Sequence, residues 1–97
     1  MALTETHVVS AHKDGAIDLA VEHLIAGKLV AVPTETVYGL AADALNYIAV
    51  QHIFETKGRP ANNPLICHVS DVDMADRYVA VTEIARSLMS KFWPGPL

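Results

Sequence analysis

The fold is decided by the stretch AIDLAVEHLIAGKLVAVP, residues 16–33. Its first part, residues 16–26, places apolar side chains at the spacing of a helix. Asp14 is expected to cap this helix and Gly27 to end it. Residues 29–32 then form a continuous apolar run closed by Pro33, which is typical of a buried strand. Because a helix leads directly into a buried strand, the sequence predicts an α/β fold.

The rest of the chain continues the alternation of helices and strands. The patterns predict a strand within 37–42, a helix over 46–56, a strand over 64–69, a short helix within 72–79 and a last helix capped by Thr82. Glycine and proline end the second helix at 57–60, and 61–63 form a polar loop. Three short strands hardly complete an α/β sheet, so we expect part of a larger domain. A small complete α+β domain is the alternative.

Composition excludes several classes of protein. The 97 residues indicate one domain, and 52% apolar with 19% charged residues is too apolar for a disordered chain. The net charge of −4 argues against a dedicated nucleic-acid binder. We expect no membrane span and no signal peptide, because no apolar run is long enough and residues 1–12 lack the required pattern. The single cysteine, Cys67, excludes an internal disulfide and is expected to be a buried structural thiol.

A segment rich in hydroxyl groups, PTETVYGL at 33–40, follows the first predicted strand. Ligands of open α/β sheets bind outside the carboxyl ends of the strands. If the segment is extended, the hydroxyls of Thr34 and Thr36 face the same side and suit a small polar ligand. A solvated turn with local hydroxyl bonds is the structural alternative.

Two cations lie one glycine apart in KGRPANNP, residues 57–64. Glycine permits backbone angles that bring Lys57 and Arg59 to one point, where both suit a phosphate. The alternative is a helix end whose cations face the helix dipole. His68 ends a predicted strand and is more often a structural group than a ligand. The other histidines lack paired metal spacing, so we expect no metal site.

Three segments together carry a family resemblance: PTETVYGL at 33–40, IFETKGRPANNPLICHV at 53–69 and FWPGPL at 92–97. In this order and spacing they resemble the YrdC/Sua5 family. The resemblance implies a twisted open mixed sheet with flanking helices, of which this chain holds a truncated part. It also implies a cytoplasmic threonylcarbamoyl-AMP synthase, a nucleotidyltransferase that uses L-threonine, bicarbonate and ATP, with downstream tRNA-modifying proteins as partners.

Residue roles follow from the same resemblance. Thr36 and His68 resemble threonine-contacting positions, and Thr34 and Tyr38 lie in the same motif and are expected to shape that pocket. Lys57, Arg59 and Asn63 resemble positions that hold the nucleotide phosphates, with Lys57 and Arg59 stabilising charge during adenylation. Mg²⁺ is expected to travel with ATP rather than to occupy a carboxylate cage.

The family's domain continues beyond its Trp-Pro-Gly-Pro-Leu segment into a Ser-x-Asn motif that completes the nucleotide site. No Ser-x-Asn occurs here, so residues 15–97 are expected to be a partial YrdC-like domain with little activity alone. The resemblance begins at about residue 15, and residues 1–14 are expected to be an amino-terminal segment. Weak double-stranded RNA binding, a non-catalytic YrdC-like module and the carbamoylation domain of a hydrogenase-maturation protein remain alternative functions.

Overall fold

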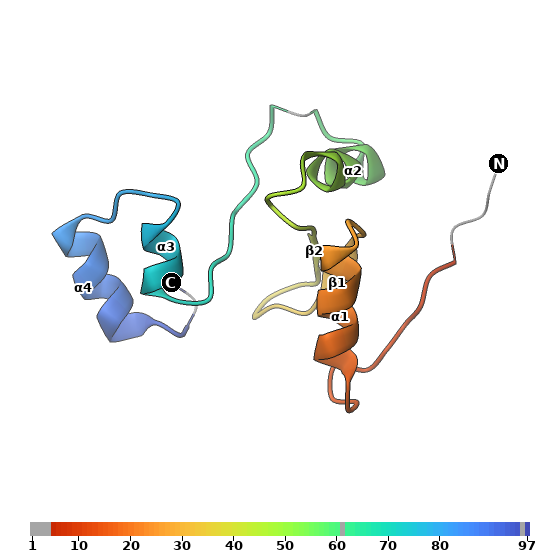
Figure 1. Ribbon diagram of the computed structural model, residues 1–97, viewed down its shortest axis with the longest axis horizontal. Helices are drawn as coiled ribbons and strands as arrows, with labels where there is room; N and C mark the ends of the chain where they lie inside the picture. Colours follow the sequence, from red (N-terminus) through yellow and green to blue (C-terminus); the bar gives the residue numbers. More distant parts are fainter. Residues whose placement is uncertain (1–4, 61, 96) are drawn as a thin grey trace. The chain divides into compact units, whose positions relative to one another are not determined.

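The computed structural model describes residues 5–60, 62–95 and 97, and it confirms the α/β class (Figure 1). The chain divides into two compact units, Met1–Asn63 and Pro64–Leu97. Residues 1–4 of the expected amino-terminal segment, Ala61 of the expected polar loop and Pro96 of the last motif lie outside the described residues.

Helix α1, Ala16–Ile25, agrees with the predicted helix, although its amino-terminal cap does not. Gly15 occupies the cap position with φ 81°, and no side chain among the described residues caps the helix. The predicted Asp14 cap is therefore wrong, because a left-handed glycine separates Asp14 from the first turn. At the other end Gly27 also has φ 81°, and the Lys28 N–H donates to the His23 carbonyl at 2.9 Å. Gly27 ends the helix as predicted.

The two predicted strands after α1 are present and form a hairpin, although the first is not buried as predicted, since Ala31 is exposed and its two valines are half-buried. β1, Val30–Val32, pairs antiparallel with β2, Gly39–Ala41. The register places Val32 opposite Gly39, so residues 33–38 form the loop that joins the strands. The described sheet contains these two strands, with α1 packed against β1. The hydroxyl-rich motif is consequently held at a hairpin end rather than along a strand.

Helix α2, Tyr47–Lys57, begins and ends at residues with clear local causes. The Asn46 side chain accepts a hydrogen bond from the Ala49 N–H at 3.1 Å, which satisfies a free donor of the first turn. Gly58 takes φ 65°, and the Arg59 N–H donates to the Phe54 carbonyl at 3.0 Å. This carboxyl-terminal cap stops the helix between the two cations, as the glycine predicted.

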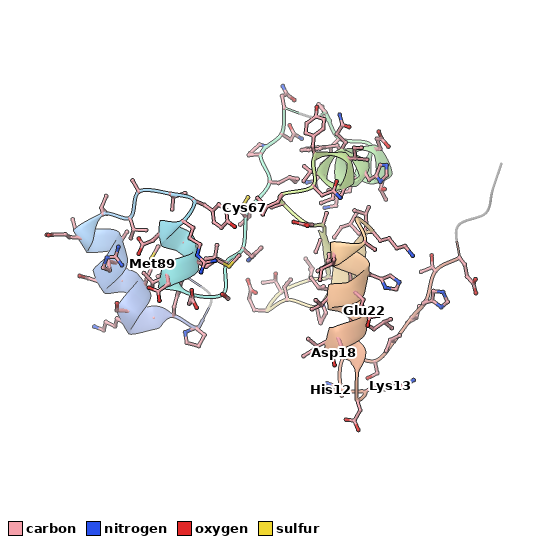
Figure 2. The ribbon with its side chains drawn as sticks, in the orientation of Figure 1. His12, Lys13, Asp18, Glu22, Cys67 and Met89 are labelled. Atoms are coloured by element: carbon pink, nitrogen blue, oxygen red, sulfur yellow. The ribbon has the colours of Figure 1, made fainter. Side chains whose placement is uncertain are left out.

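The predicted strand at 64–69 is wrong. These residues form neither a strand nor a helix, and Cys67 is exposed rather than buried (Figure 2). An apolar run becomes a strand only where a neighbouring strand offers backbone partners, and no described segment pairs with it. The expectation of a buried thiol depended on that strand, and it fails for the same reason.

The second unit contains two capped helices, α3, Val72–Asp76, and α4, Glu83–Phe92. The predicted Thr82 cap is confirmed, since its hydroxyl accepts from the Ala85 N–H at 3.2 Å. Arg86 of α4 donates to both carboxylate oxygens of Asp76, at 2.7 and 3.2 Å. The hydrogen bond and charge of Asp76 raise the pKa of Arg86. This two-pronged ion pair ties the end of α3 to α4.

Candidate functional site

The loop at 33–38 is bent, and its conformation is organised around one hydroxyl. Thr34 Oγ1 donates to the Val37 carbonyl and accepts from the Thr36 N–H at 3.2 Å. The two threonine hydroxyls lie 3.4 Å apart. They meet because the backbone turns, not because the segment is extended as the sequence suggested. The local hydroxyl bonds of the structural alternative are therefore present, and they are compatible with a ligand role for the exposed groups.

The side chains beyond Thr34 are presented to solvent. Thr36 is exposed, and Val37 and Tyr38 keep 74% and 76% of their accessible surface. Comparable exposure occurs at other large apolar side chains of the chain, such as Ile17 at 75% and Leu45 at 76%, so exposure by itself does not mark this loop as a binding site. The loop offers a hydroxyl and an aromatic ring together at the end of the hairpin, close to where strand β2 begins.

The cation pair lies on either side of the left-handed Gly58 at the end of α2. Lys57 is the last residue of the helix, and Arg59 follows the glycine. Arg59 borders an open depression of about 260 Å³ that is also lined by Gln51, Phe54, Glu55 and Gly58. Asn63 donates its backbone N–H to the Pro60 carbonyl at 3.1 Å, which turns the chain after the cations. Both cationic side chains are exposed and free to meet an anionic ligand.

Three residues of this depression were not anticipated from the sequence. Gln51, Phe54 and Glu55 lie on the face of α2 that continues into Gly58 and Arg59. The i, i+3, i+4 and i+7 spacing of residues 51, 54, 55 and 58 is the signal that could have found them. Phe54 supplies an apolar wall, and Gln51 supplies an amide.

The predicted site residues form two groups in the first unit and one position in the second. Thr34, Thr36 and Tyr38 share the hairpin loop, whereas Lys57, Arg59 and Asn63 share the segment after α2. Among the described residues, no hydrogen bond or ion pair links these two groups. His68 is exposed on the 64–69 segment of the second unit. The role of each residue stays a prediction.

Metal-binding side chains do not gather in the described part of the chain. Over residues 5–60, 62–95 and 97, no three histidine, cysteine, aspartate or glutamate side chains are placed to hold a metal ion. The acidic side chains Asp18 and Glu22 project from successive turns of α1 (Figure 2). Among the helices described, none has the length and apolarity needed to cross a membrane.

The family model and the related proteins that match this chain belong to the same family. The Sua5/YciO/YrdC family model, described as "Telomere recombination", matches residues 22–97. The chain is 51% identical over 82 residues to a threonylcarbamoyl-AMP synthase of Pyrococcus abyssi, covering 84% of this chain and 24% of that relative. It is 48% identical over 85 residues to the Bacillus subtilis threonylcarbamoyl-AMP synthase, covering 87% and 25% respectively.

Solved structures agree with the sequence relatives. The P. abyssi Sua5 structure complexed with L-threonine matches with a TM-score of 0.77 at 51% identity, covering 82% of this chain and 24% of that one. A doubly substituted P. abyssi Sua5 matches with a TM-score of 0.78. The chain thus spans about a quarter of the length of the relatives that it matches. The matched family model covers most of the sequence, and the chain belongs to the Sua5/YciO/YrdC family.

Proposed function

We propose that the protein acts in the synthesis of threonylcarbamoyl-AMP from L-threonine, bicarbonate and ATP. The observation that carries the proposal is the 51% identity to a Sua5 protein whose structure contains L-threonine, across a stretch that includes both exposed motifs. The hydroxyl-bearing loop suits a small polar substrate, and the Lys57–Arg59 turn suits a phosphate. The proposal extends to a cytoplasmic role that supplies tRNA-modifying proteins.

The proposed chemistry has two steps. The amine of threonine forms a C–N bond with bicarbonate, which gives the carbamate and releases water. A carbamate oxygen then attacks the α-phosphorus of ATP, and the bond to pyrophosphate breaks. Negative charge develops on the phosphoryl oxygens in this second step, so fixed cations accelerate it. We assign that stabilisation to Lys57 and Arg59, with Mg²⁺ arriving on the nucleotide.

The remaining predicted residues are proposed to hold substrates. Asn63 follows the cationic turn, and its exposed carboxamide suits phosphate or ribose oxygens. Thr36 and His68 are proposed to contact threonine, and Tyr38 is proposed to cover it. Positioning of the substrates contributes to the rate of such a reaction. The amine must first be held against the carbon of bicarbonate, and the resulting carbamate must then be held against the α-phosphate of ATP.

The test is pyrophosphate release from ATP that depends on both threonine and bicarbonate. It is run on the 97-residue chain and on the product of the complete reading frame. Lys57→Gln and Arg59→Gln should each weaken ATP binding about tenfold to a hundredfold, because each removes a charge-assisted bond. Lys28→Gln, an exposed lysine outside the motif, is the matched control. Turnover that ignores threonine, or equal losses in all three variants, contradicts the proposal.

A further inference from the structure

The 33–38 loop contains a hydroxyl whose hydrogen-bonding capacity is already full. A threonine hydroxyl has one proton and two lone pairs. The proton of Thr34 goes to the Val37 carbonyl, because a carbonyl can only accept. One lone pair takes the Thr36 N–H at 3.2 Å, and the second faces the Thr36 hydroxyl at 3.4 Å. Thr34 therefore has nothing left to offer a ligand.

This saturation fixes the direction of the bond between the two threonines. Because the proton of Thr34 points to the Val37 carbonyl, the Thr36 hydroxyl is the one available donor at their 3.4 Å contact, which is longer than an ordinary hydroxyl hydrogen bond. The exposed Thr36 Oγ1 then keeps only lone pairs for a ligand. In this arrangement the atom suits a donor partner, such as an amine, an ammonium or a hydroxyl group, better than a carboxylate or phosphate oxygen.

The methyl group of Thr34 lies beside the first residue of β2. A Cβ placed on Gly39 would lie 3.7 Å from Thr34 Cγ2, which is ordinary van der Waals distance. The side chain of Thr34 thus lies over the first residue of β2 while its hydroxyl spans the loop to Val37. The hydroxyl of this exposed side chain is therefore engaged within the loop, and its methyl group lies beside β2.

We infer that Thr34 is a positioning residue that locks the hairpin loop and sets Thr36 Oγ1 as an acceptor for a donor group of the substrate. The inference rests on the proposed function for the identity of that substrate. L-Threonine carries two groups that fit, its amine and its hydroxyl. Preorganisation of this kind lowers the ordering cost of binding.

The first measurement needs no substrate. Thr34→Val removes the hydroxyl and keeps the shape, whereas Thr34→Ser keeps the hydroxyl. In the full 97-residue chain, Thr34→Val should speed hydrogen exchange of the Thr36 amide about tenfold and average the Thr36 χ1 coupling constants, and Thr34→Ser should preserve both. Unchanged exchange and couplings in Thr34→Val overturn the inference, whatever the protein's activity.

The second measurement is binding of L-threonine by calorimetry. Thr34→Val should weaken binding about tenfold and Thr34→Ser should restore it, because only the hydroxyl orders the loop. Equal affinity of wild type and Thr34→Val overturns the inference. A wild-type chain that binds no threonine, while its Thr36 amide still responds to Thr34→Val, contradicts the proposed function of this chain and leaves the loop lock supported.

Comparison of ligands then separates the two donor groups. L-2-Aminobutyrate lacks the hydroxyl of threonine, and 3-hydroxybutyrate lacks its amine. Thr36→Val should weaken binding of threonine and of the analogue that retains the recognised donor, and should leave the other analogue unaffected. If Thr36→Val weakens all three ligands equally, or none, Thr36 is not the acceptor and that half of the inference is overturned.

Discussion

The two units of the chain hold their structure by different means. The first unit, residues 5–63 of the described chain, packs Ala49 and Ile53 of α2 into its interior and turns at left-handed glycines. The second, from Pro64 onward, buries Ala75 and is organised mainly by capped helix ends, to which the exposed Arg86–Asp76 pair adds little. The loops proposed to carry chemistry are therefore restrained by turns, whereas His68 lies on residues 64–69, which pair with no strand in the described part of the chain.

The largest expected effect comes from the interior of the first unit. Ile53→Ala should lower the free energy of unfolding by about 2–4 kcal/mol, because it removes a buried side chain and leaves a cavity. Ile48→Ala on the same helix is the matched control, since Ile48 is 63% exposed and its loss should cost under about 1 kcal/mol. Urea unfolding measures both. Similar midpoints for the two variants contradict the assigned packing of α2.

The next largest loss of stability in the first unit is expected from substitution of a glycine with a left-handed backbone conformation. Gly27→Ala should cost about 2–3 kcal/mol, because Ala disfavours φ 81° and its Cβ would lie 2.9 Å from Asn46 Nδ2, which disturbs the cap of α2. Gly15→Ala has the same φ and no atom within 4 Å, so it should cost about 1–2 kcal/mol. Thermal unfolding that ranks Gly15→Ala as the more damaging change would reverse this explanation.

In the second unit, the caps at the helix ends are expected to contribute most to the stability of the helices. Thr82→Ala should destabilise α4 by about 1 kcal/mol, since the Ala85 N–H loses its acceptor. Thr82→Ser retains a hydroxyl and should behave nearly as wild type. Hydrogen exchange of the Ala85 amide measures the effect locally. Faster exchange throughout the first unit, with none at Ala85, would show that the cap is not the cause.

The smallest effect is expected at the ion pair. Arg86→Gln should shift the unfolding midpoint only slightly, and less at high salt, because both partners are exposed and solvent screens the attraction. Lys91→Gln on the same helix removes a charge that pairs with no carboxylate in the described structure, and it is the control. A large shift that persists in salt would mean that Arg86 supports α4 through packing rather than charge.

Features encoded by a few neighbouring residues were predictable. The Thr82 cap and the helix stops at Gly27 and Gly58 follow from local backbone chemistry, and all three are confirmed. The strand predicted at 64–69 failed because an apolar run does not reveal whether a partner strand exists. The prediction of an Asp14 cap was wrong for a different reason. Both Asp14 and Gly15 are suitable residues for a helix start, and the left-handed backbone of Gly15 places the cap there.

In the candidate site, too, some features were predictable from neighbouring residues and others depended on the folded chain. The residue types in the two motifs predict a loop that binds a small polar ligand and a turn that binds an anion. The reason is that hydroxyl, guanidinium and ammonium groups each form hydrogen bonds with a limited set of ligand groups. The depression formed by Gln51, Phe54 and Glu55 beside Arg59 was missed, since helix-face neighbours matter only once the helix end is placed.

The sequence by itself determined the α/β class, the helix limits near glycine and threonine, and the motifs that place the chain in its family. Those features depend on side-chain chemistry and on contacts within one or two turns. Tertiary structure alone decided which strands pair and that Cys67 stays exposed. Pairing and burial depend on atoms brought together by the fold, and a linear pattern does not specify those atoms.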